Sequence, residues 1–323
     1  MTKLTLERQQ LWIYLAALLT GGLWGWRYGE ADSGLDAGVA IALGLLLYAT
    51  FCQVPLTHLR RAFGHRRFMA ALIVGNFVMV PLVVWAMATL LLDDPKLQFG
   101  VFLVLLVPCT DWFLTFTYLG GGSLPLAIAA TPILLLLQSL LLPLYLWLFT
   151  AGSLAAEIDP TAFVDALVGL ILLPLGAALL TEKWAESHPS GERWLKLIAW
   201  LPIPLLSLVL LLIAASQVNV LITQPLAPLV NVILIFVAFL VLNGYLARWL
   251  GQWAGLDTAT NRTLAFSLGT RNSFVVLPFA LALPDTWAVV VAIVVVQPLV
   301  ELTGMIIYLW WVPQRLLKAL PPA

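Results

Sequence analysis

Three ionisable residues lie in the interior of long apolar segments of the sequence: Asp111, Arg271 and Glu301. An ionised side chain is costly in hydrocarbon, and such residues usually face a protein interior or a water-filled cavity and serve a function. Because an isolated charge would be penalised, we expect Asp111 and Arg271 to pair, either as a purely structural ion pair or within a binding site. Glu301 follows Pro298, which can kink a helix, and it could either carry a proton or hydrogen-bond a neighbour as a neutral acid.

Two of these residues belong to short polar clusters that interrupt apolar segments. One cluster reads VPCTDWF at positions 107–113, and the other reads LGTRNSF at positions 268–274. When the two are aligned, both combine a helix breaker with polar residues, and Asp111 faces Asn272. Matching interruptions in the two halves of a chain are typical of binding sites in secondary transporters. The sequence therefore predicts a substrate site at these two interruptions.

The candidate site residues are the polar side chains at the interruptions and the buried carboxyl groups. The substrate-binding candidates are Cys109, Thr110, Asp111, Arg271, Asn272 and Ser273, and the candidates for proton or ion coupling are Glu301 and Asp111. A second group of polar residues could line a cavity or hydrogen-bond between helices: Asn76, Gln138, Ser267, Thr270 and Gln297. Taken alone, Cys109 and Cys52 are typical of small hydrophobic residues in an apolar span.

The segments that must position these residues are long, continuous and apolar. Hydrophobic residues make up 62% of the 323-residue chain and charged residues 10%, whereas ordinary soluble domains have about 25% charged residues. Spans must be helices or a closed barrel, and these runs lack the alternation of barrel strands. With about 20 residues per span, we predict ten helices, near 9–28, 37–57, 68–92, 99–118, 124–149, 161–181, 197–217, 226–249, 263–284 and 286–311.

The predicted fold class is an all-α integral membrane protein that forms a single polytopic unit. Ten helices divide into two halves of five, about 1–150 and 151–323, and an odd-numbered unit repeated in tandem must be inverted in the membrane. The longest hydrophilic connection, at 181–196, is predicted to be a loop.

The charges of the connections predict the orientation of the chain. With a cytoplasmic N-terminus, the outer connections contain Arg27 and Lys96, and the other basic residues outside the spans lie on the cytoplasmic side. Because positive residues are enriched in cytoplasmic loops, we predict a multi-pass protein of the inner or plasma membrane with both termini in the cytoplasm.

The sequence disfavours several other functions, and it leaves a channel or a membrane-embedded hydrolase as minor alternatives. Its 16 basic and 16 acidic residues give a formal net charge of zero, which does not favour nucleic-acid binding. It contains no Walker A sequence, no His-Glu-x-x-His sequence and no Cys-x-x-Cys pair. The histidines lie in predicted connections, so a membrane-embedded hydrolase would lack its usual base. We therefore expect a secondary transporter that is not an enzyme, with no cofactor and no resident metal.

Ten helices in two inverted halves, with the fourth and ninth helices interrupted near the middle of the membrane, resemble the bile acid:sodium symporter superfamily. The resemblance covers essentially the whole chain. It implies that the fourth and ninth helices cross within a core subdomain. It also implies that the first, second, sixth and seventh helices form a panel subdomain, so that panel and core are interleaved in the sequence.

Two residues resemble those of the arsenical-resistance-3 branch of that superfamily. Cys109 matches a cysteine in its fourth helix, and Glu301 matches a glutamate in its tenth. The match implies efflux of arsenite or antimonite in exchange for protons, with Cys109 contacting the metalloid as a soft ligand and Glu301 carrying the proton. The alternative is a sodium- or proton-coupled carrier of a small organic anion or a bile-acid-like molecule, with Arg271 binding its carboxylate. The expected partners are therefore the bilayer, a small-molecule substrate and a coupling proton.

The chain departs from the family pattern at two places. Sodium-coupled members carry a Glu-x-Gly-x-Gln-Asn type of sequence in the ninth helix, where this chain has Ser267 for the glutamate and Arg271 for the glutamine. We therefore expect transport to be independent of sodium. Arsenite exporters carry a basic residue just before the helix 4 cysteine, where this chain has Pro108, so the organic-anion alternative stays open.

Overall fold

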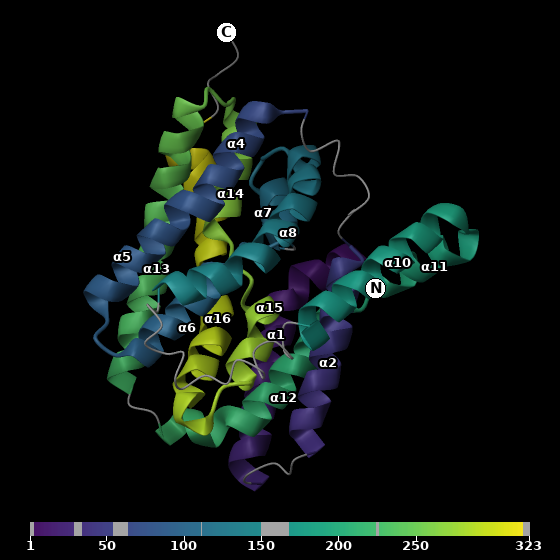
Figure 1. The fold of residues 1–323 in the computed structure, drawn as a ribbon, viewed down its shortest axis with the longest axis vertical. Helices are drawn as coiled ribbons and strands as arrows, with labels where there is room; N and C mark the ends of the chain where they lie inside the picture. Colours follow the sequence, from purple (N-terminus) through teal and green to yellow (C-terminus); the bar gives the residue numbers. More distant parts are fainter. Residues whose placement is uncertain are drawn as a thin grey trace. The chain divides into compact units, whose positions relative to one another are not determined.

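The computed structural model describes the chain as a set of helices (Figure 1). The described residues are 3–28, 34–53, 64–110, 112–149, 168–223 and 226–318. Every regular element within these ranges is a helix, which confirms the predicted all-α fold for this part of the chain.

Several of these helices are long and apolar enough to cross a membrane. In the described ranges, four single helices meet this criterion: Arg66–Leu91, Leu124–Phe149, Pro228–Trp253 and Ala288–Leu316. A fifth span forms if Pro189–Ile198 and Pro202–Ser216, which are bent by 43° at a short break, are taken together. The prediction of a multi-pass integral membrane protein is confirmed, whereas the ten-helix count and the inverted repeat stay predictions.

The chain divides into two compact units, and each is assembled from three separate stretches. The first comprises Met1–Thr57, Ile158–Pro225 and Leu277–Ala292, and the second comprises His58–Glu157, Leu226–Val276 and Ile293–Ala323. Two of the boundaries between them fall inside helices, in α15 (Ser273–Leu281) and α16 (Ala288–Trp311).

The first unit contains helices from the N-terminal part and the middle of the chain. Its elements are α1 (Lys3–Tyr28), α2 (Gly34–Phe51), the π-helical turn η3 (Val168–Leu172), α10 (Leu173–Ser187), α11 (Pro189–Ile198), α12 (Pro202–Thr223) and the 3-10 turn η4 (Asp285–Trp287). The helix predicted at 161–181 begins outside the described residues.

Helix α1 lies closely along α12 because two glycines face it (Figure 1). A Cβ at Gly21 would overlap the backbone of Leu211, and a Cβ at Gly25 would overlap the backbone of Ala215. Small residues four apart let transmembrane helices approach until their backbones touch. The sequence GGLWG in α1 therefore fixes how closely these two helices pack.

The hydrophilic segment 181–196, which we predicted to be a loop, is mostly helical. Helix α10 extends to Ser187, and α11 begins directly afterwards at Pro189, a residue that favours the first turn of a helix. Lys196 and Glu192 form an exposed i,i+4 ion pair of 2.6 Å in α11, which supports a helix outside the membrane. The prediction was wrong because polarity shows only that a segment is solvated, and the helix propensity of its residues decides its conformation.

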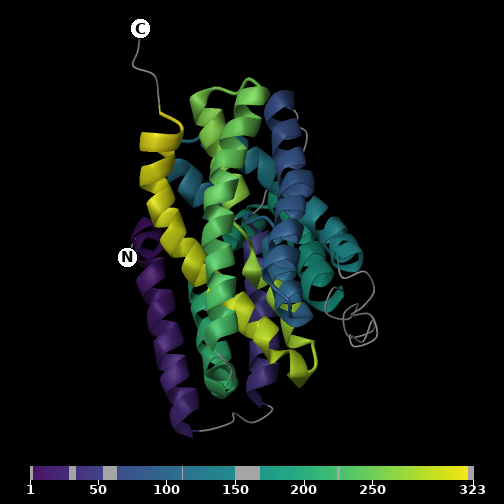
Figure 2. The same ribbon diagram turned by 90° about the vertical axis from the view of Figure 1, so that its left-hand side faces the viewer.

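The second unit contains the two interrupted helices and their neighbours. Its elements are α4 (Arg66–Val74), the π-helical turn η2 (Gly75–Met79), α5 (Val80–Leu91), α6 (Pro95–Leu105), α7 (Trp112–Leu119), α8 (Leu124–Phe149), α13 (Leu226–Trp253), α14 (Thr258–Gly269) and the π-helical turn η5 (Val312–Leu316), together with most of α16. In Figure 2, α13 (green) runs beside the continuous helix formed by α4, η2 and α5 (blue).

Local sequence explains how α13 turns into α14. Gly255 has a φ of +64°, a conformation that side chains disfavour and that commonly ends helices. The Leu256 amide donates back to the Gly251 carbonyl at 2.9 Å, which closes the turn. Asp257 then caps α14, because its carboxylate accepts from the Thr260 amide at 3.0 Å. This tight turn sets α14 against α13 and fixes where α14 begins.

Candidate functional site

The two polar clusters are interruptions between helices in the structure. The chain leaves α6 at Leu105 and resumes as α7 at Trp112, and it leaves α14 at Gly269 and resumes as α15 at Ser273. The two interruptions pair through an antiparallel bridge between Pro108 and Arg271.

The bridge supplies partners for backbone groups that the broken helices cannot satisfy. The Cys109 amide donates to the Thr270 carbonyl at 3.2 Å, and the Asn272 amide donates to the Val107 carbonyl at 2.8 Å. Non-helical backbone is tolerated at membrane depth only where protein or a water-filled cavity surrounds it. Trp112 and Phe274 also meet edge to face across the pair, with ring centroids 6.5 Å apart. Each interruption therefore stabilises the other.

Glu301 binds the main chain of the second interruption. Its Oε2 accepts from the Arg271 amide at 2.9 Å and from Gln297 Nε2 at 2.5 Å, and the side chain is 2% exposed. Gln297 in turn hydrogen-bonds Ser273, the first residue of α15. A Cβ at Gly269 would lie 2.9 Å from Met305 Cε and 3.0 Å from Tyr308 Cε1, so the glycine makes room for these two side chains of α16.

The Arg271 side chain is held by uncharged oxygen atoms. Its Nη2 donates to Asn76 Oδ1 at 3.0 Å, to the Leu268 carbonyl at 2.8 Å and to the Ser267 carbonyl at 3.3 Å. The guanidinium also stacks over the ring of Phe239, 5.3 Å from its centroid, a geometry that stabilises a cation. The side chain is 2% exposed. Arg271 is therefore a buried cation that is held by three oxygen acceptors through Nη2 alone.

Asn76 reaches this cation from the π-helical turn η2. Besides accepting from Arg271, its Nδ2 donates to Ser267 Oγ at 3.0 Å and to the Leu72 carbonyl at 3.1 Å. A π-helical turn inserts one residue into a helix and turns side chains away from the regular register, and such turns are frequent at functional sites. The distortion at 75–79 explains why an amide from the middle of an apolar span points at the interruption.

The other predicted site residues have different roles in this geometry. Asn272 caps α15, because its Oδ1 accepts from the Val275 amide at 3.2 Å. Thr110 is buried, and within the described residues its hydroxyl has no hydrogen-bond partner. Cys109 is 5% exposed and interacts electrostatically with Arg271. Asp111, the predicted partner of Arg271, lies outside the described residues, so that pairing stays a prediction.

The structure brings together most of the polar residues that the sequence singled out, with one exception and one addition. Gln138 lies buried on α8, and its amide has no partner among the described residues. Phe239, which covers the Arg271 guanidinium, was missed. Nothing in the sequence distinguishes it from other aromatic residues in an apolar helix. Asn243, one turn further along α13 and bonded to the Phe239 carbonyl at 2.9 Å, was the nearest polar signal.

The fold and this geometry define a class of protein: a multi-pass membrane protein in which two interrupted helices meet beside buried charged residues, as in secondary transporters. Comparison with known protein families matches residues 40–224 to the sodium bile acid symporter family. The match spans more than half of the chain, and the protein belongs to this family. It is therefore a secondary transporter of the sodium/bile acid symporter type, a class that couples the movement of a small molecule to that of an ion. No curated protein matches the chain.

Proposed function

We propose that the protein exports trivalent arsenic or antimony hydroxide in exchange for protons. The observation that carries the proposal is the hydrogen bond between the Glu301 carboxylate and the Arg271 amide. It links a buried acid directly to the main chain of the interruption that pairs with the one holding Cys109. A change in the protonation of Glu301 thereby changes the geometry of the candidate substrate site.

The two carboxylate oxygens of Glu301 have different roles in the proposed coupling. Oε2 accepts two N–H bonds, while Oε1 has no hydrogen-bond partner among the described residues. A proton arriving at Oε1 converts an acceptor into a donor and weakens the charge-assisted bonds to Oε2. The hydrogen bond between the Arg271 amide and Glu301 Oε2 is then weaker. Proton binding and a rearranged interruption are thus one event, as exchange transport requires.

The thiol of Cys109 is the ligand that suits the metalloid. A thiol is a soft ligand, and trivalent arsenic and antimony prefer sulfur over hard oxygen ligands. The thiol can replace one hydroxide of the neutral trihydroxide, forming a sulfur–metalloid bond while the thiol proton leaves with the hydroxide as water. A single cysteine gives a contact that reverses readily, which suits a carrier.

The test is arsenite uptake into everted membrane vesicles, driven by a pH gradient in which the vesicle lumen is acidic. We expect Cys109→Ser to lower uptake at least about tenfold, the effect of losing roughly 1.4 kcal/mol of binding. Cys52→Ser is the matched control, because Cys52 lies just past the end of α2 in the first unit. Equal uptake by Cys109→Ser and the wild type would refute the role of the thiol, and absence of wild-type uptake would refute the substrate.

A second candidate substrate is a small organic anion, and one observation favours it. Nε and Nη1 of Arg271 have no hydrogen-bond partner among the described residues, and a guanidinium with unused donors suits a carboxylate. The same vesicles separate the candidates when they are supplied with a radiolabelled monocarboxylate or bile acid. Uptake that depends on Arg271 but not on Cys109 would support the anion and contradict the metalloid.

A further inference from the structure

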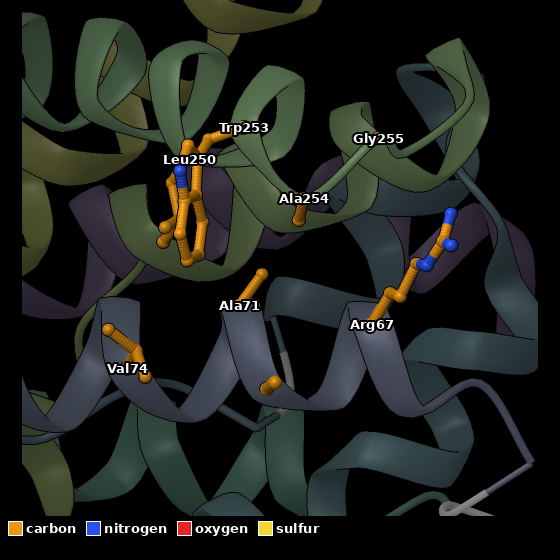
Figure 3. Close-up of a pocket in the computed structure, with 8 residues that line it drawn as sticks. Arg67, Ala71, Val74, Leu250, Trp253, Ala254 and Gly255 are labelled. Atoms are coloured by element: carbon orange, nitrogen blue, oxygen red, sulfur yellow. The ribbon is translucent and has the colours of Figure 1, made fainter.

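A groove between α4 and α13 lies away from the candidate transport site. Its lining comes from Arg67, Ala70, Ala71 and Val74 of α4 and from Leu250, Trp253, Ala254 and Gly255 at the end of α13, and it encloses about 490 Å³. Figure 3 shows Arg67 beside Gly255 at one end, and Trp253 with Val74 toward the other. We call it the α4–α13 groove. One end is cationic, and the other is apolar.

Small residues create the hollow. Ala70 and Ala71 face the groove from α4, and Ala254 and Gly255 face it from the turn that ends α13. Gly255 needs its positive φ of 64°, so a side chain there would be strained. A Cβ at that position would also lie 3.6 Å from Arg67 Nη1. That distance is an ordinary van der Waals contact, so the backbone conformation, and not crowding against Arg67, is what requires glycine here.

The groove runs from a membrane surface into the hydrocarbon. Arg67 is one residue from the start of the span Arg66–Leu91, and Trp253 is the last residue of the span Pro228–Trp253. Both mark the same interface, where Arg and Trp are favoured. Val74 lies two turns further along α4, about 10 Å deeper at 1.5 Å per residue. Trp253 is 79% exposed and Val74 41% exposed, so the groove opens toward lipid.

At the cationic end, basic side chains outnumber carboxylates among the described residues. A neighbouring hollow of about 400 Å³ shares Arg67 and Gly255 and adds His65, Arg66 and Asp257 to its lining. The Asp257 carboxylate keeps its negative charge, but it accepts hydrogen bonds from the amide and hydroxyl of Thr260 and not from Arg67. Among the described residues, Arg67 forms no ion pair with a carboxylate. An anion is therefore the complementary ligand for this end.

We propose that the α4–α13 groove binds one anionic phospholipid. The Arg67 guanidinium takes the phosphate of the headgroup, with Arg66 and His65 beside it, because basic pockets between transmembrane helices at an interface recognise such headgroups. An acyl chain lies over Ala70 and Val74 toward Leu250. The Trp253 indole covers it at the depth where amphipathic rings collect. The basic residues select the lipid headgroup, and the apolar residues of the groove bind the acyl chain. This site is independent of the transported substrate.

The test is native mass spectrometry of the purified full-length protein with phosphatidylglycerol and phosphatidylcholine that carry identical acyl chains. We expect the wild type to bind phosphatidylglycerol several-fold more tightly. Arg67→Gln should weaken phosphatidylglycerol binding about fivefold, as expected for one basic residue near the surface. It should weaken phosphatidylcholine binding less, because the choline cation already offsets the charge of the phosphate. Arg193→Gln, an exposed arginine of α11 outside the groove, is the matched control.

A second variant probes the apolar part without changing charge. Ala70→Phe fills the groove and should weaken binding of both lipids, whereas Ala40→Phe, at an exposed position of α2, should weaken neither. The proposal is overturned if the wild type does not distinguish the two lipids. It is also overturned if Arg193→Gln weakens phosphatidylglycerol binding as much as Arg67→Gln, because the preference would then come from surface charge in general.

Discussion

Glu301 and Arg271 are the two residues on which the proposed coupling depends, and each is held in an unusual way. The carboxylate binds a main-chain amide, and the guanidinium binds an amide side chain, two carbonyls and an aromatic face. Both are almost fully buried. Buried charges persist only when hydrogen bonds replace their hydration. Burying two charged groups in the membrane costs free energy, and a role in transport accounts for this cost.

Replacing Glu301 with glutamine should separate coupling from folding. Glutamine retains a carbonyl oxygen that can accept from the Arg271 amide and from Gln297, but it cannot release a proton. We expect Glu301→Gln to abolish uptake driven by a pH gradient, down to the level of vesicles without the protein, while its melting temperature in detergent stays near that of the wild type. Glu186→Gln, at an exposed position of α10, should behave as the wild type. Full pH-driven uptake by Glu301→Gln would rule out the proton-carrying role.

Transport should not require sodium, because Arg271 already binds three of the oxygen acceptors at the interruption. A sodium ion needs several hard oxygen ligands, and Asn76 Oδ1 and the carbonyls of Ser267 and Leu268 are taken by Nη2. Two unit charges about 4 Å apart repel by roughly 4 kcal/mol at an effective dielectric of 20, which corresponds to nearly a thousandfold in affinity. Counterflow in proteoliposomes should be unchanged when choline replaces sodium at constant pH and ionic strength. Loss of most of the flux would show that the guanidinium does not take the place of the ion.

At the scale of elements, close approach between helices depends on single glycines. The contact of α1 with α12 in the first unit provides an internal comparison. A Cβ at Gly25 would overlap the Ala215 backbone, whereas a Cβ at Gly22 would have Val218 Cγ2 as its nearest neighbour at 3.9 Å. The two glycines share a helix but only one of them faces the partner helix.

Gly25→Ala should therefore destabilise the protein by about 1–3 kcal/mol, the usual cost of overpacking. Gly22→Ala should be neutral or slightly stabilising, because alanine is the better helix former. Thermal unfolding of the two variants in detergent measures the difference. A loss of stability in Gly22→Ala equal to that in Gly25→Ala would mean that helix packing is not the cause.

The cap of α14 predicts a pH-dependent contribution to stability. The Thr260 hydroxyl donates to Asp257 at 2.5 Å, and this bond lowers the pKa of the carboxyl below its ordinary value of 3.8. A carboxyl with a lowered pKa stabilises the fold above its ordinary pKa, and the contribution is lost as the pH falls through the folded-state pKa. We expect Asp257→Ala to cost about 1 kcal/mol at neutral pH, with a smaller difference from the wild type below pH 3.8.

Denaturant unfolding at neutral and acidic pH measures this difference. Asp93→Ala is the control, because Asp93 is exposed and precedes the residue that caps α6. If the effect of Asp257→Ala does not shrink in acid, the charge of the carboxylate is not the source of the stabilisation.

At the scale of the whole molecule, the distribution of basic residues predicts the orientation in the membrane. Reporter fusions near Asp94 and Ala155 should lie outside the cytoplasm, and a fusion near His188 should lie inside, because the basic residues concentrate on one side of the predicted spans. Alkaline phosphatase and fluorescent-protein fusions at these positions measure the orientation. Opposite results at two of the three positions would contradict the ten-helix topology.

The sequence by itself determined the class of protein and the places where its helices break. Hydrophobic composition requires helices that lipid can solvate, and proline and glycine interrupt helices through their own backbone chemistry, so both properties can be read locally. The polar residues at 107–113 and 268–274 and the intramembrane carboxyl of Glu301 could be found in the sequence for the same reason, whereas the role of Glu301 stays a prediction. The error at 181–196 was also local, because polarity was given more weight than helix propensity.

Only the tertiary structure decided which groups meet. Arg271 and Asn76 are 195 residues apart in sequence yet lie 3.0 Å apart through their side chains, and the π-helical turn that aims Asn76 has no sequence signature. Glu301 binds an amide of the main chain, a partner that a pattern of side chains cannot indicate. The α4–α13 groove likewise arises because small residues on two distant segments face each other. Such contacts depend on packing between helices, which periodicity and composition constrain only weakly.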